Sequence, residues 1–158
     1  MPGIYASNIK FYRCSSWGEG DSHGGDIDLN NEILSNVDEA VFDDVSNEER
    51  SSGDTEYRKI FVRNENTGEG SDWEYVKAWI SQETPATNSE IFIASGTNDD
   101  TLATASGYDF QHPLVKASGI DLGTISSSGY APLWIRRVIS QGGPGYTQDS
   151  FEISFESS

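Results

Sequence analysis

Acidic side chains are the residues of this sequence best suited to chemistry, and half of them are crowded into one stretch. Residues 19–56 contain 13 of the 26 Asp and Glu residues, with Arg50 as the only Lys or Arg. The adjacent pairs Asp43–Asp44 and Glu48–Glu49 are of the type that general acid–base catalysis uses. Catalysis would also require a cleft and a partner that shifts a carboxyl pKa, and the sequence indicates neither. Since paired acids are common in solvated loops, we assign no catalytic residue here and expect a loop between two strands.

A calcium site is the second kind of chemistry that this acidic stretch suggests. Residues 26–30 read DIDLN, which places oxygen-bearing side chains at alternate positions, as in the first half of a calcium-binding loop. The pattern then stops, because Asn31 stands where such a loop requires glycine and Val37 stands where it requires the closing glutamate. The same alternation is typical of a strand with one polar face. We therefore predict a strand, with no metal site and no cofactor.

The thiol and imidazole side chains do not form a recognisable nucleophile–base or metal-ligand motif. Cys14, in the strand-like stretch IKFYRC, is the only cysteine, so a disulfide within the chain is excluded. His23 and His112 are the only histidines and lie 89 positions apart, unlike the closely spaced histidines of metal sites. We interpret Cys14 as a small apolar side chain and both histidines as loop residues. The sequence does not predict an enzyme.

The elements that would position these residues are short strands. Strand-like segments recur between clusters of Gly, Ser, Asn and Asp, and no segment has a sustained helical periodicity. Eight or nine short strands at this spacing predict a single domain over residues 1–158, an all-β antiparallel β-sandwich that is jelly-roll-like. The expected strands are Asn8–Cys14, Asp26–Ile33, Val37–Phe42, Tyr57–Asn64, Trp73–Ile80, Glu90–Ala94, Tyr108–Val115, Tyr130–Ser140 and Ser150–Glu156.

Two of these strands are apolar or aromatic on both faces. Because a strand directs successive side chains to opposite faces, Trp73, Tyr75 and Trp79 should share one face, opposite an aliphatic face. Tyr130–Ser140 is similar and also carries two arginines, which need carboxylate or aromatic partners if they are buried. The second face requires cover from loops of the same chain or from another protein chain. The interface residues that we predict are Trp73, Tyr75, Trp79, Trp134 and Arg136.

The last expected strand has the clearest alternation. Phe151, Ile153 and Phe155 alternate with polar residues that include Glu152 and Glu156. The pattern predicts that the three apolar side chains face the core and that the two glutamates face solvent.

The overall charge limits the classes of partner. The net charge at pH 7 is −16, which repels the phosphates of DNA and anionic lipid. No apolar run approaches the length of a membrane span, and the first residues lack the pattern of a signal peptide. We therefore expect synthesis in the cytoplasm and neither nucleic acid nor membrane as a partner.

Short motifs spread over nearly the whole chain carry a resemblance to known proteins. They are NIKFYRC (residues 8–14), FDDVS (42–46), GDTEYR (53–58), VRN (62–64), KAWI (77–80), GYAPLWIRRVI (129–139) and DSFEISFE (149–156). Together they resemble a family of small virion proteins of tailed bacteriophages and prophages. NEERSSG, at residues 47–53, departs from the Ala-rich stretch usual in that family, although it is still loop-like.

The resemblance implies a non-enzymatic structural component of a virion. Such a component belongs to the neck or collar, the tail or baseplate, or the capsid surface as decoration. It would assemble with other copies of itself and with other virion proteins, after synthesis in the cytoplasm of the infected host. The resemblance implies no catalytic residue.

A carbohydrate-binding module on a phage fibre or baseplate is the alternative. In such a sandwich, exposed aromatic rings would stack on sugars, and the candidates are Trp17, Trp73, Trp79 and Trp134. Retention of a sugar on a glycan array would favour this alternative over a purely structural role.

Overall fold

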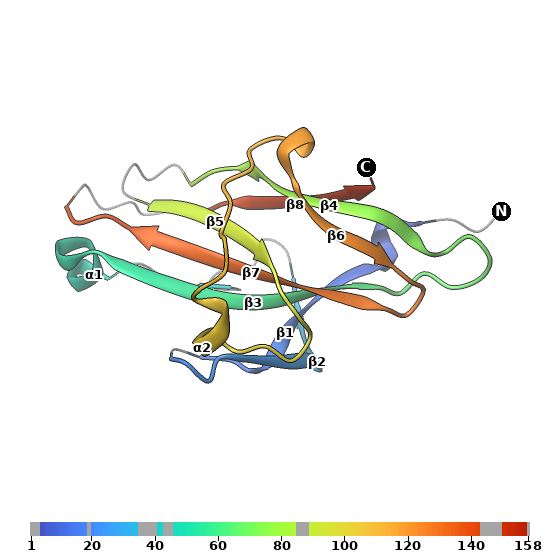
Figure 1. Ribbon diagram of the computed structural model, residues 1–158, viewed down its shortest axis with the longest axis horizontal. Helices are drawn as coiled ribbons and strands as arrows, with labels where there is room; N and C mark the ends of the chain where they lie inside the picture. Colours follow the sequence, from blue (N-terminus) through green and yellow to red (C-terminus); the bar gives the residue numbers. More distant parts are fainter. Residues whose placement is uncertain are drawn as a thin grey trace.

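Eight strands form two antiparallel sheets that pack face to face, which confirms the predicted all-β sandwich. Figure 1 shows this computed structural model, which describes residues 4–18, 20–34, 41–42, 46–84, 89–142 and 150–157. The five-stranded sheet has the order β2-β1-β3-β7-β5, and the three-stranded sheet has the order β6-β4-β8. The elements are η1 (Ala6–Asn8), β1 (Ile9–Ser16), β2 (Gly24–Ile33), α1 (Asn47–Ser52), β3 (Asp54–Asn64), β4 (Trp73–Gln82), β5 (Ser89–Ser95), α2 (Leu102–Ala105), η2 (Lys116–Ser118), β6 (Ile120–Ile125), β7 (Tyr130–Ile139) and β8 (Glu152–Ser157).

The core between the sheets consists of aliphatic side chains at alternate strand positions. Ile60, Leu133 and Ile135 come from the five-stranded sheet, and Ala78 and Ile80 come from the three-stranded sheet. All five side chains are buried, because each strand directs every second residue into the layer between the sheets.

The opposite face of the five-stranded sheet is covered by the chain itself. The segment that contains α2 lies in front of this sheet in Figure 1, and Ala105 and Phe110 pack there on Trp134. The chain then passes the outer edge of β5, where Gln111 and Ile93 exchange two backbone hydrogen bonds of 2.8 Å. This connection satisfies polar backbone groups of β5 that would otherwise face solvent.

Several element predictions differ from the structure. Residues 108–115 form a covering segment with an isolated bridge at Gln111, so the predicted strand Tyr108–Val115 is wrong. The strand β6 was missed. Residues 37–40 of the predicted strand Val37–Phe42 lie outside the described residues, while Phe42 is buried in the core.

Helix α1 replaces part of the loop that we expected in the acidic stretch. Its first turn has a capping box, in which the Glu49 N–H donates to the Ser46 hydroxyl and the Ser46 N–H donates to the Glu49 carboxylate, both at 3.1 Å. These bonds satisfy N–H groups that helix formation leaves without a partner. Among the described residues, no helix has the length and apolar character to cross a membrane.

A bulge in β4 changes the face on which Trp73 lies. Trp73 pairs with Ile125 and Val76 pairs with Gly123, so β4 has one residue more than β6 in this interval. Tyr75 sits in the bulge with φ +53°. Because the extra residue resets the alternation, Trp73 and Val76 are both buried in the core, and the predicted common face of Trp73 and Tyr75 is wrong.

The structure confirms which residues around β8 face the core and which face solvent. Phe151, Ile153 and Phe155 all pack against the core, and Glu152 and Glu156 are exposed. The three apolar side chains are only partly buried, however, because β8 is an edge strand with one neighbour, β4, among the described strands.

Candidate interface on the open side of the sandwich

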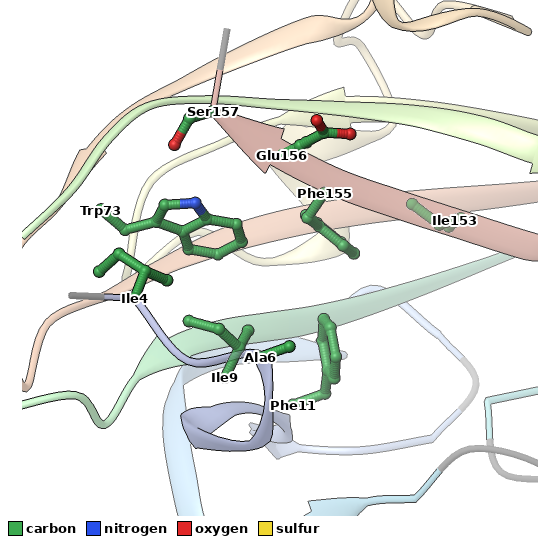
Figure 2. A pocket seen from close by; sticks show the side chains of 9 residues that line it. All are labelled: Ile4, Ala6, Ile9, Phe11, Trp73, Ile153, Phe155, Glu156 and Ser157. Carbon is green, nitrogen blue, oxygen red and sulfur yellow. The ribbon is translucent and has the colours of Figure 1, made fainter.

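A surface pocket lies between β8 and the start of the chain, and we call it the edge pocket. Its volume is about 440 Å³. Figure 2 shows Phe155 of β8 above Phe11 of β1 on one side of the pocket, and their ring centroids are 5.2 Å apart. Trp73 forms another wall and Ile4, with 37% of its surface exposed, lies at the rim. The lining residues are Ile4, Ala6, Ile9, Phe11, Trp73, Ile153, Phe155, Glu156 and Ser157.

The edge pocket exists because the two sheets have different widths. β8 lies above β1, as the contact between Phe11 and Phe155 shows. β2 continues the larger sheet beyond β1, and Ile33 of β2 pairs with Phe11 and so faces the same side. No described strand lies beyond β8 to cover this region. In the part of the chain that the structure describes, the sandwich is therefore open along this side of β8.

β8 has one side with which no described strand pairs, and we call this side its free edge. The outer face of the strand beside this edge is acidic. Its outward-facing residues are Glu152, Ser154 and Glu156, and the strand contains no basic residue. Lys116 lies 3.3 Å from Glu156, in an ion pair that is exposed on both sides and so contributes little to stability. The open side thus presents an apolar pocket beside negative charge.

The predicted interface residues of β4 have different environments. Tyr75 is 68% exposed and Trp79 is partly buried, whereas Trp73 is buried and forms a wall of the edge pocket. The φ of Tyr75 is in the left-handed region, which is unfavourable for a residue with a bulky side chain. Since this exposed ring has little packing role within the chain, Tyr75 is a candidate contact residue on the outer surface of the smaller sheet.

The predicted interface residues of β7 are engaged within the chain. Trp134 is fully buried, so its assignment to an interface is wrong. It fills the layer between the five-stranded sheet and the segment around α2. The guanidinium of Arg136 lies 4.5 Å from the Phe92 ring centroid and 4.8 Å from that of Phe110, which supplies the aromatic partners that the sequence required.

A buried ion pair that we did not predict from the sequence joins the five-stranded sheet to the covering segment. Lys59 and Asp100 are buried, and the Lys59 Nζ lies 2.7 Å from the Asp100 carboxylate. The ammonium also donates to the carbonyl oxygens of Gly25 at 2.8 Å and Asn98 at 2.9 Å. A Cβ at Gly96 would collide with the Asp100 carboxylate and the Trp134 indole, so this close approach requires glycine.

The Asp100 carboxylate is held in its charged form. Burial by itself would raise the pKa of Asp100, but its hydrogen bonds outweigh burial and lower the pKa below its ordinary value. Those bonds come from Lys59, the Tyr108 hydroxyl at 2.6 Å, the Thr97 N–H at 2.9 Å and the Trp134 Nε1–H at 3.0 Å. The same contact with Asp100 raises the pKa of Tyr108 to about 12. This network fastens the covering segment to β3.

His23 and Cys14 are adjacent but are not arranged for nucleophilic catalysis. The Cys14 sulfur lies 3.7 Å from His23 Nε2, and both residues are about 1% exposed. Burial raises the pKa of the Cys14 thiol, while burial and the nearby charges of Arg58 and Lys59 lower the pKa of His23 to about 4. A reactive pair requires the opposite shifts, toward thiolate and imidazolium.

The imidazole of His23 has a structural role, unlike the loop residue that we predicted. The Lys59 backbone N–H donates to Nε2 at 2.8 Å, at the point where the pairing of β1 with β3 has ended. The Gly18 backbone N–H lies 3.1 Å from Nδ1. Because a neutral imidazole has only one acceptor nitrogen, we assign that role to Nε2, which faces the buried Lys59 N–H. His23 thereby replaces a strand as hydrogen-bond acceptor for β3.

One cluster of carboxylates lies in the acidic stretch. Oxygen atoms of Glu49, Asp54 and Glu56 lie within 4.8 Å of one another. Arg137 donates to Glu56 through Nε at 3.0 Å and forms an ion pair with it, which supplies the carboxylate partner that the sequence required for a buried arginine of β7. The guanidinium therefore provides positive charge at this cluster.

Comparison of the chain with protein-family models, curated proteins and solved structures finds no match.

Proposed function

We propose that this protein is a non-enzymatic structural component that works by assembling with other protein chains. The single observation that carries the proposal is the edge pocket beside the free edge of β8. Unpaired strand edges readily pair with other chains, and natural sandwiches usually protect them. Four side chains of types that catalysis uses are buried and hydrogen-bonded within the chain, namely Cys14, His23, Lys59 and Asp100.

The proposed setting is the virion of a tailed bacteriophage, in the neck or collar, the tail or baseplate, or on the capsid surface. This setting rests on the resemblance of the FDDVS, GDTEYR and VRN motifs and of the strand sequences that follow them. The partners would be other virion proteins and other copies of the chain. The net charge of −16 favours protein partners over nucleic acid or anionic membranes.

A carbohydrate-binding module is the second candidate, and one observation favours it. Tyr75 is exposed on the outer face of β4, with Trp79 four residues further along the strand. Aromatic rings on a sheet surface could stack on a sugar. Trp73 and Trp134 are buried and cannot contribute to such a surface.

Co-expression tests the proposed function. The chain would be produced together with the products of its neighbouring genes and analysed by size-exclusion chromatography and electron microscopy. We expect it to elute in a defined complex with at least one virion protein. Elution as a monomer beside all of these products would contradict the proposal, and retention of a sugar on a glycan array, lost in Tyr75→Ala, would favour the carbohydrate-binding alternative.

A further inference from the structure

We propose that β8 accepts an additional strand from a different protein chain, and that this strand alternates apolar residues with lysine or arginine. The inference rests on the proposed assembly function and adds the chemistry of the partner. Three observations carry it: the free edge of β8, the edge pocket beneath that edge, and the acidic outer face of the strand.

Among the described strands, β8 is paired on one side only, by β4. The strand pairs with β4 through the register that matches Ala78 with Phe155 and Ile80 with Ile153. Alternate residues of a strand direct their N–H and C=O groups to opposite sides, so β8 also presents hydrogen-bonding groups away from β4. A partner strand would lie about 4.8 Å beyond β8, over the side of the larger sheet that β1 and β2 form. Pairing of this kind is a common mode of peptide recognition.

The edge pocket specifies the inner face of the partner. Phe155 contacts Phe11, Ile153 lines the same pocket from β8, and Ile4 adds an exposed apolar side chain at the rim. A strand that lies beside β8 presents every second side chain to the same inner layer. Apolar residues at alternate positions would therefore enter the pocket and bury surface that is now partly exposed.

Charge specifies the outer face of the partner and argues against a second copy of this chain. The outward residues of β8 are Glu152, Ser154 and Glu156. If two copies of β8 paired with their apolar faces inward, each glutamate would lie opposite a serine or another glutamate. Like charges directly opposite each other destabilise a strand pair, whereas opposite charges contribute about 0.2–1 kcal/mol each. Lysine or arginine in the partner would pair with Glu152 and would add to the positive charge that Lys116 and Lys77 already place near Glu156.

Three synthetic peptides test this inference on the intact protein by isothermal titration calorimetry. The alternating peptide is acetyl-Lys-Val-Lys-Val-Lys-Val-Lys-amide, the block peptide has the same residues in the order Val-Val-Val-Lys-Lys-Lys-Lys, and the acidic peptide has Glu in place of Lys. We expect the alternating peptide to bind at least about tenfold more tightly than the block peptide, since only alternation fills the pocket and meets both glutamates. Equal binding of the two basic peptides would mean attraction to net charge alone and would overturn the inference.

A charge reversal on β8 locates the binding site. Glu152→Lys/Glu156→Lys should weaken binding of the alternating peptide by about tenfold, the equivalent of about 1.4 kcal/mol for two cross-strand pairs, and should create binding of the acidic peptide. Glu48→Lys/Asp109→Lys makes the same change in net charge at two exposed positions outside β8 and should leave the preference for alternation intact. If both double variants lose the same affinity, β8 is not the site.

The occupant is tested by sedimentation of the protein alone. We expect any self-association to be the same in Glu152→Lys/Glu156→Lys, because copies of the chain would meet away from β8. A dimer that this variant alters would show that a second copy occupies β8 and would overturn the inference. The co-expressed complex separates this result from the proposed function. If that complex forms but is unchanged by the β8 variant, the assembly function stands and the inference is wrong.

Discussion

Lys59→Met removes the buried ammonium while it keeps an unbranched side chain. The Asp100 carboxylate, 4% exposed, would lose a cation that lies at 2.7 Å. The carbonyl oxygens of Gly25 and Asn98 would lose a donor at the same time. Removal of one partner from a buried ion pair costs about 3–5 kcal/mol, which is a large part of the about 5–15 kcal/mol that stabilises a typical domain.

Urea unfolding at pH 7, followed by tryptophan fluorescence, measures this loss. Lys77→Met is the matched control, because Lys77 and Asp121 form an ion pair of 3.6 Å in which the aspartate is 79% exposed. We expect this control to cost less than about 1 kcal/mol.

The double variant Lys59→Met/Asp100→Leu should cost less than the sum of its single variants, because each single change already removes the ion pair. If Lys59→Met were no more destabilising than Lys77→Met, the network would not fasten the covering segment, and our interpretation of the face around α2 would be wrong.

Three further predictions concern acid stability, the core and the exposed surface. His23 is neutral in the folded protein, where its pKa is about 4 against an ordinary 6.5. Between these two pH values the unfolded chain binds a proton that the folded protein does not. The free energy of unfolding should therefore be fully present above pH 6.5 and decrease by about 3 kcal/mol as the pH falls toward 4, at about 1.4 kcal/mol for each pH unit. In urea unfolding from pH 7 to pH 4, His23→Gln should remove this part of the decrease, whereas an unchanged profile would contradict the buried neutral imidazole. Phe155→Ala should destabilise the protein less than Phe61→Ala, because Phe155 is partly buried and Phe61 is fully buried. For Phe61→Ala we expect a loss of about 3–5 kcal/mol in the free energy of unfolding. Equal losses for the two variants in chemical denaturation would show that the edge pocket is closed. Tyr75→Gly should leave stability unchanged or increase it by up to about 1 kcal/mol, since glycine adopts the positive φ of this bulge without strain, and a loss above 2 kcal/mol in thermal unfolding would show that the ring belongs to the fold.

The strand content and the faces of the most regular strands could be predicted from the sequence. Phe151, Ile153 and Phe155 show why, since strict alternation leaves one arrangement that buries them. The face on which Trp73 lies could not be predicted in this way. The bulge at Tyr75 inserts one residue into β4 and reverses the alternation. Neither Glu74 nor Tyr75 is a glycine, the residue that often marks a bulge in a sequence.

The buried polar network could be predicted only in part. Lys59 stands inside an apolar strand, which is the same signal that indicated partners for the two arginines of β7, and it was overlooked. Asp100 could not be identified as its partner, because it lies 41 positions away in a loop that only the tertiary structure brings over the sheet. The edge pocket likewise depends on which strands become neighbours, and the sequence does not specify strand order.

A structure of the co-expressed complex by electron cryomicroscopy tests the central claim most directly, because it shows what lies beside β8. We expect an extended segment of another protein chain paired with Glu152–Ser157, with apolar side chains in the edge pocket and basic side chains opposite Glu152 and Glu156. A complex in which the edge of β8 and the edge pocket both face solvent would contradict it.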